Sequence, residues 1–152
     1  MLQQKDIRKI EDIATGFFKK IDSDIDVEVE KTDDRNVEIN VKMDKPQVLI
    51  GENGQTLKGT ERLLRLALRN NIDKRFYISL DINDYKKKKR DYLEQKAREA
   101  ANEVSLTGVE KKMPALPASE RRIVHIELED REDVKTESVG KDPERQVVIK
   151  PA

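Results

Sequence analysis

Two hydrophobic periods follow one another in a fixed order along the first half of this sequence, and that order restricts the possible folds. Apolar residues recur at helical spacing over residues 4–20, which predicts an amphipathic helix. The period then becomes two, which predicts strands over residues 25–29, 37–43 and 76–82. Such strands have one apolar face that a helix must cover, so the pattern predicts a layered α+β domain.

The segment between the second and third predicted strands adds two helices. Pro46 suits the first turn of a short helix, and Gly51 is expected to end it. A longer helix is predicted over residues 55–70, and the polar stretch KTDDRN is the predicted turn between the first two strands. The order α-β-β-α-α-β therefore defines a first domain over residues 1–82.

A second domain is predicted over residues 83–152, and it begins with a linking helix. Asn83 or Asp84 is expected to cap that helix. The predicted elements are helices over residues 84–104 and 118–130, a short strand within 105–120, and strands over 134–139 and 145–151. They make a three-stranded sheet with two helices, so the fold class is α+β with two small α/β sandwich domains.

Charge is abundant in this chain but balanced. Lysine and arginine number 31, and aspartate and glutamate also number 31, so the chain has no overall basic signature. The distribution is uneven, since residues 23–44 hold 8 acids and 3 bases whereas residues 45–80 hold 7 bases and 3 acids. The positive charge therefore begins close to the glycines at 51 and 54.

Several classes of protein are excluded by residues that the chain lacks. Without cysteine, and with a single histidine, it offers neither a disulfide framework nor a cysteine- or histidine-based metal site. No apolar stretch is long enough to span a membrane, and the first residues lack the apolar core of a signal peptide. These absences predict a cytoplasmic protein without membrane insertion.

The stretch QVLIGENGQTLKGTERLLRLALRN carries the first candidate site. Gly51 and Gly54 lack Cβ atoms, so backbone N–H groups between two helices can meet a phosphate, and the following helix directs its positive end there. Bases recur on one side of that helix, at Lys58, Arg62, Arg65 and Arg69, which predicts a stripe along a sugar–phosphate backbone. The alternative is a turn followed by an ordinary solvated helix face.

The stretch PASERRIVHIELED carries the second candidate site. Arg121 and His125 are four residues apart, so on a helix they project from the same side. Arginine offers phosphate a planar fork, and the histidine ring can stack on a base. Lys141 and Arg145 are candidates for the same basic surface. The alternative is a histidine at a helix surface or core edge. The basic run YKKKKRDY, in the linking helix, has two interpretations as well: a contact to nucleic acid or a solvated helix start.

The first site resembles a known family. The stretch LIGENG, within the order α-β-β-α-α-β, resembles a KH domain of the bacterial (type II) arrangement, whose loop clamps about four nucleotides of a single strand. The resemblance assigns Ile50, Gly51, Glu52, Asn53 and Gly54 to the nucleic-acid site, with Ile50 packed beneath the loop. This chain departs from the family at Glu52 and Asn53, where nucleic-acid-binding KH loops usually carry a lysine or arginine. Glu52 would repel a phosphate.

The second site resembles another family. MPALPASERRIVH, VKTESVG and RQVVI resemble the R-three-H domain, a module named for its Arg-x-x-x-His motif that binds single-stranded nucleic acid. Residues 4–150 are then similar to the C-terminal part of the Jag (SpoIIIJ-associated) family, without its separate N-terminal Jag domain. The resemblance implies a cytoplasmic, regulatory or chaperone-like RNA-binding protein in bacterial cell elongation and envelope control. A small KH-only protein or a second copy is the expected protein partner.

Three classes of function follow from these observations. The leading prediction is binding of single-stranded RNA, or of single-stranded DNA, by two modules. The second is a protein–protein adaptor that keeps the KH scaffold for dimerisation, which Glu52 and the neutral total charge favour. An enzyme is not expected, because the chain has one histidine, no cysteine, no metal cluster and no phosphate-loop lysine motif. No cofactor is predicted.

Overall fold

The computed structural model describes all of residues 1–152, and the chain divides into two compact units, Met1–Lys86 (unit 1) and Lys87–Ala152 (unit 2). The elements of unit 1 are α1 (Gln4–Lys19), β1 (Asp26–Lys31), β2 (Asn36–Lys42), α2 (Gln47–Ile50), the 3-10 helix η1 (Glu52–Gly54), α3 (Gln55–Arg69) and β3 (Tyr77–Ile82). Helix α4 (Tyr85–Thr107) begins in unit 1 and continues into unit 2. The other elements of unit 2 are β4 (Lys111–Lys112), α5 (Ala118–Leu128), β5 (Val134–Val139) and β6 (Gln146–Pro151).

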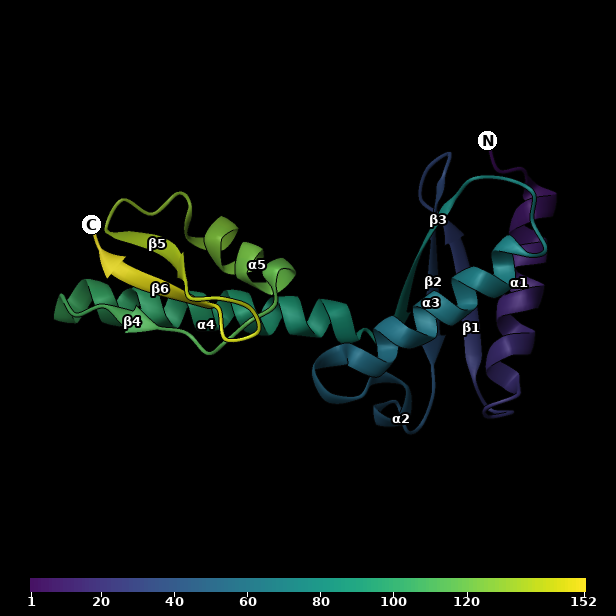
Figure 1. The fold of residues 1–152 in the computed structure, drawn as a ribbon, viewed down its shortest axis with the longest axis horizontal. Helices are drawn as coiled ribbons and strands as arrows, with labels where there is room; N and C mark the ends of the chain where they lie inside the picture. Colours follow the sequence, from purple (N-terminus) through teal and green to yellow (C-terminus); the bar gives the residue numbers. More distant parts are fainter. The chain divides into compact units, whose positions relative to one another are not determined.

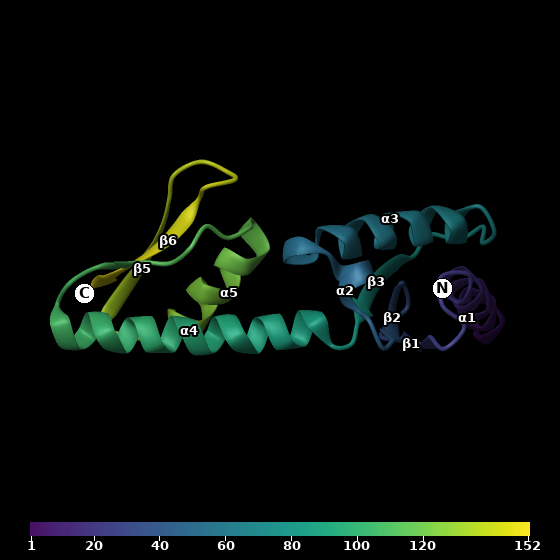
Figure 2. The same cartoon turned by 90° about the horizontal axis from the view of Figure 1, so that it is seen from below.

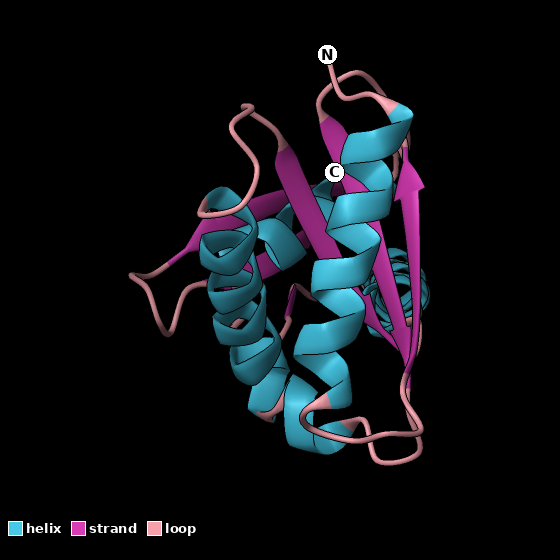
Figure 3. Ribbon diagram, turned by 90° about the vertical axis from the view of Figure 1, so that its right-hand side faces the viewer, coloured by secondary structure: helices cyan, strands magenta, loops and turns pink.

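Unit 1 is a three-stranded sheet with helices on one face. The strand order is β1-β2-β3, with β1 antiparallel and β3 parallel to the central strand. Every second residue of β2 and β3 is buried, and these side chains share one core with α1 and α3. Figures 1 and 3 show α1 and α3 side by side against the sheet. This burial follows from the period-two and helical patterns of the sequence.

The opposite face of this sheet is acidic. Its residues are the exposed or half-buried positions that alternate with the core, namely Asp26, Glu28, Glu30, Asn36, Glu38, Asn40, Lys42, Tyr77, Ser79 and Asp81. Glu30 lies directly opposite Glu38 in the β1–β2 pair, although like charges in such positions repel. The acidic stretch seen in the sequence is therefore gathered on one surface.

Unit 2 is a second three-stranded sheet packed with helices. The strand order is β4-β6-β5, and both pairings are antiparallel. Val147 and Ile149 of the central strand are fully buried in a core with residues of α4 and α5. Within this unit, Figure 2 shows α5 and the β5–β6 hairpin on the same side of α4.

The predicted elements are confirmed, as is the α+β class. The structure differs at the start of α4, where neither expected residue caps the helix. The Asp81 carboxylate accepts the Lys86 N–H at 3.1 Å, while the Asn83 side chain pairs with the backbone of Met43 at 2.9 and 2.8 Å. Asn83 and Asp84 both have positive φ and form the turn. The division into domains after residue 82 stays a prediction. None of the helices is both long enough and apolar enough to cross a membrane.

Candidate nucleic-acid interface

The Gly51–Gly54 segment is a tight loop whose backbone conformation demands its glycines. Gly51 has φ 71° and ψ −177°, a region essentially restricted to glycine, and a Cβ there would lie 2.8 Å from Thr56 Cβ. Gly54 has φ 75°, and its Cβ would lie 3.1 Å from the Tyr85 ring. Asn53, at φ 52°, is one of the few other residue types that tolerate the left-handed region. The loop is therefore fixed by its own sequence.

The same loop presents free backbone donors at the start of α3. The Gln55 N–H donates to the Glu52 carbonyl, but no side chain caps the helix, so the N–H groups that follow Gln55 in the first turn are available to a ligand. Glu52 and Asn53 are exposed, while Ile50 beneath the loop is buried. The loop can thus be approached from solvent, and Glu52 is the one acid at its tip.

Helix α3 carries the predicted basic residues in two different settings. Lys58, Arg62 and Arg69 are exposed on one side of the helix. Arg65 is half-buried instead, and its guanidinium donates to Glu61 at 2.9 Å. The free positive surface of α3 therefore consists of Lys58, Arg62 and Arg69. Arg65 could contact a ligand only if its ion pair with Glu61 were broken.

Glu61 joins α3 to the outer strand of the sheet. One carboxylate oxygen accepts the backbone N–H of Leu80 in β3 at 3.0 Å. The other accepts Arg65, and Lys86 lies 3.4 Å from the carboxylate. β3 is an edge strand, so Glu61 occupies an N–H that would otherwise be open.

The basic run at the start of α4 is partly neutralised. Lys86 pairs with Glu61 at 3.4 Å, and Lys89 lies 3.9 Å from Glu120 within unit 2. Lys87, Lys88 and Arg90 are exposed. The structure thus leaves the solvated-helix alternative in place for this segment.

Arg121 is a buried cation with an incomplete set of partners. The residue is 6% exposed, and its Nε has no hydrogen-bond partner. Its only ion-pair partner is Asp142, at 3.4 Å, a long contact to a side chain that is itself 66% exposed. Burying a charge is costly unless it is paired and hydrogen-bonded, so this guanidinium has capacity for a further anion.

His125 lies one turn further along α5 and contacts strand β5. Its Nδ1 and Nε2 lie 2.7 Å from the hydroxyl oxygens of Thr136 and Ser138, respectively. A neutral imidazole donates from one nitrogen and accepts at the other, and hydroxyls can complete both bonds. Burial and the nearby Arg121 charge lower the pKa of His125. The ring therefore stays neutral near pH 7 and ties α5 to β5.

Lys141 and Arg145 lie in and after the turn that carries Asp142. Lys141 is exposed, whereas Arg145 is half-buried and its Nε has no partner. The Arg145 carbonyl accepts the Leu116 N–H at 3.1 Å, which holds the end of the turn against the segment before α5. Nowhere in the chain do three or more histidine, cysteine or carboxylate side chains gather in a way that could hold a metal ion.

The helices and three-stranded sheet of unit 2, with the Arg121–His125 pair on α5, agree with a known domain family. Residues 91–151 match the family model of the R-three-H domain, so unit 2 contains an R-three-H domain, as predicted.

The chain as a whole is homologous to proteins named RNA-binding protein KhpB. It is 30% identical over 146 residues to that of Streptococcus pneumoniae serotype 2, covering 92% of this chain and 44% of the relative. It is 30% identical over 148 residues to the protein of Clostridium symbiosum, a match that covers 97% of this chain and 65% of the relative. It is 32% identical over 129 residues to the protein of Bacillus subtilis strain 168, a match that covers 84% of this chain and 61% of the relative. The chain thus spans between 44% and 65% of the length of these relatives.

Two residues that shape the site could not be selected from sequence alone. Asp142 looks like an ordinary turn residue, and Glu61 like one end of a helical i, i+4 pair with Arg65. Their roles depend on partners distant in sequence, Arg121 and Leu80. The i, i+4 spacing could indicate only that Arg65 has a local acid within reach.

Proposed function

We propose that this chain binds single-stranded RNA through two modules, a type II KH domain in unit 1 and the R-three-H domain in unit 2. The KH assignment is supported by the α-β-β-α-α-β order and by the glycine loop at the start of an uncapped helix. RNA is favoured over single-stranded DNA because the homologous proteins are named RNA-binding proteins.

The distribution of charge in unit 1 supports this proposal despite the net charge of zero. The open sheet face carries Glu28, Glu30 and Glu38, which repel phosphate, whereas α3 on the other face carries exposed Lys58 and Arg62. A strand of RNA is therefore directed to the helix side of the unit. Segregated charge can attract a polyanion even when the total is neutral.

The single observation that best supports the proposal is that Arg121 is buried with an incomplete set of partners. Arg121 is 6% exposed, its Nε lacks a hydrogen-bond partner, and its guanidinium lies 3.4 Å from the exposed Asp142 carboxylate. This arrangement fits an anion site in which the Asp142 carboxylate occupies the position of a phosphate. Arginine can hold a phosphate through two parallel hydrogen bonds, which are shorter and stronger than this contact. RNA binding at this site requires a phosphate oxygen to displace Asp142.

This displacement predicts a gain of affinity from removing an acid. Asp142→Asn should tighten binding of an unstructured oligoribonucleotide, because the phosphate then competes with a neutral amide. Glu144→Gln, an exposed acid in the same turn, is the matched control for loss of a negative charge, and Arg121→Gln should weaken binding. Fluorescence anisotropy at several salt concentrations measures all four proteins. Equal effects of the two acid variants would contradict the displacement, and absence of parent binding would contradict the RNA function itself.

A second candidate function, a protein–protein adaptor, is favoured by a separate observation on α3. Leu63 and Leu66 are 60% and 57% exposed, and Gly59 beside them is open to solvent in the middle of a helix. Glu52→Lys separates the two candidates. It should tighten RNA binding if the loop faces phosphate, while Leu63→Ala should leave RNA binding unchanged. If Glu52→Lys leaves affinity unaltered, the loop does not contact phosphate and the adaptor is favoured.

The resemblance to the Jag family also supports a proposal for the cellular role and the protein partner of this chain. It supports a regulatory or chaperone-like role for RNA binding in the cytoplasm, linked to bacterial cell elongation and envelope control. It also supports association with a small KH-only protein or with a second copy. Crosslinking of the protein to RNA in growing cells, with the attached residues mapped, tests the first of these statements directly.

A further inference from the structure

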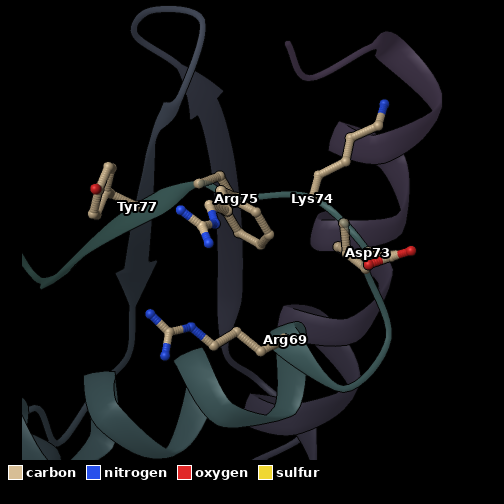
Figure 4. Close-up of a pocket in the computed structure, with 7 residues that line it drawn as sticks. Arg69, Asp73, Lys74, Arg75 and Tyr77 are labelled. Atoms are coloured by element: carbon tan, nitrogen blue, oxygen red, sulfur yellow. The ribbon is translucent and has the colours of Figure 1, made fainter.

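A pocket lies in unit 1 at the end of α3 that is remote from the glycine loop. It is open, has a volume of about 590 Å³, and is lined by Arg69, Ile72, Asp73, Lys74, Arg75, Phe76 and Tyr77. These residues come from the last turn of α3, the segment after it and the start of β3 (Figure 4). With 15 residues at 1.5 Å each, α3 is about 22 Å long, and the pocket and the glycine loop lie at its opposite ends. The pocket is therefore separate from the loop site.

Two arginines give this pocket an unbalanced positive charge. Figure 4 shows the guanidinium groups of Arg69 and Arg75 on the same side of the pocket, whereas the Asp73 and Lys74 side chains point away from them. Neither arginine takes part in an ion pair, whereas Lys74 is paired with Asp6 at 2.6 Å. Two like charges that converge on one hollow repel each other, and an anion between them would remove that repulsion.

The pocket also has an exposed aromatic ring in its lining. Tyr77 is 64% exposed and is the first residue of edge strand β3, so it lies at the border of the acidic sheet face, away from the glutamates of β1 and β2. An exposed aromatic ring in a pocket that also has guanidinium groups is suited to a nucleobase, because the base can stack on the ring while its phosphate meets the cations. A free inorganic anion would use the arginines and not the ring.

The segment that carries Arg75 is held in place by α1. Lys74 donates to the Asp6 carboxylate at 2.6 Å, and Lys9 donates to the Asn71 carbonyl at 2.5 Å. The Lys74 hydrogen bond lowers the pKa of Asp6, which keeps the carboxylate charged. Because these contacts order the segment before any ligand arrives, less conformational entropy is lost on binding.

We propose that this pocket binds one nucleotide of the RNA, with its phosphate between Arg69 and Arg75 and its base on Tyr77. The inference rests on the proposed RNA function and extends it. The strand runs from the glycine loop past Lys58 and Arg62 to the far end of α3. Unit 1 then contacts more of the strand than the loop alone, which in KH domains holds about four nucleotides.

Substitutions at Arg75 and Tyr77 test the pocket in the full chain with an oligouridine ligand. Tyr77→Ala should weaken binding at least about fivefold, whereas Tyr77→Phe, which keeps the stacking ring, should bind like the parent. Arg75→Ala should weaken binding and lower the salt slope by about 0.7, as for one lost phosphate contact on a single strand. Arg8→Ala, an exposed and unpaired arginine on α1, is the matched control and should have no effect.

Photocrosslinking supplies a readout that does not depend on affinity. Oligouridine carrying 5-iodouridine should form an adduct on Tyr77, mapped by mass spectrometry, and the yield should fall in Arg75→Ala. Adducts found only elsewhere, or an Arg75→Ala protein that binds like Arg8→Ala, would overturn the pocket proposal while leaving RNA binding intact. A parent protein that binds no oligouridine at any salt concentration would instead overturn the proposed function.

Discussion

At the scale of single residues, His125 shows how a motif residue can serve the fold and the site together. Both ring nitrogens are engaged by hydroxyls of β5, and the ring lies beside the buried Arg121 charge. The geometry gives His125 a positioning role, since it fixes the helix face from which Arg121 projects. Stacking of a base on this ring stays a prediction.

The lowered pKa of His125 predicts a pH-dependent stability with a definite sign. In the unfolded chain the imidazole takes up a proton near its ordinary pKa of about 6.5, whereas the folded protein resists protonation. The stabilisation is therefore complete above about pH 6.5 and is lost as the pH falls through the folded pKa. His125→Gln should lose this dependence between pH 7.5 and 5.5, because the chain has no other histidine.

Thermal unfolding at several pH values measures this difference, and an NMR titration of the single imidazole gives its pKa directly. A folded-state pKa at or above the ordinary value would contradict the prediction. Carboxylate titration affects parent and variant alike in this range, so the comparison between the two proteins isolates the histidine.

At the scale of elements, Glu61 connects a helix to an edge strand. Its carboxylate accepts the Leu80 N–H of β3, and it also holds Arg65 of its own helix. Glu61→Ala leaves that backbone donor without a partner, so the free energy of unfolding should fall by about 1–3 kcal/mol. Glu61→Gln keeps an acceptor and should lose less.

Chemical denaturation measures these changes, with Glu52→Ala as the control because Glu52 is exposed and has no ion-pair partner. A loss in Glu61→Ala no larger than in Glu52→Ala would show that the side chain does not support the strand edge.

The elements themselves were predictable from sequence, while several contacts between them were not. The period-two alternation predicted β2 and β3. The glycine loop was predicted because two glycines between helices let a ligand approach the backbone closely, and the positive φ of both glycines agrees with that prediction. The expected cap of α4 was wrong because Asp81 reaches forward from β3 to Lys86. The ion pair of Arg65 and the pocket with Arg75 depend on how α3 and its neighbours pack, which spacing along one helix cannot reveal.

At the scale of the whole molecule, zero net charge conceals a positive region in each of the two units. Unit 1 offers the glycine loop and exposed bases on α3, and unit 2 offers Arg121 in an R-three-H domain. In the proposed RNA-binding mode, each of these regions makes few phosphate contacts, so each alone should bind weakly and with a small salt slope. Higher affinity then requires one strand to bind both units.

This reasoning predicts avidity that depends on the length of the RNA. On an oligonucleotide of about four nucleotides, which can fill one site only, Arg62→Ala or Arg121→Gln should leave the other site binding normally. On a strand long enough to reach both units, either variant alone should lower affinity by about a hundredfold, because the second contact no longer forms within one complex. Binding curves for both lengths, at two salt concentrations, measure the effect, and Arg8→Ala again controls for loss of one exposed charge. If each variant weakens short and long strands by the same factor, the two units bind RNA independently.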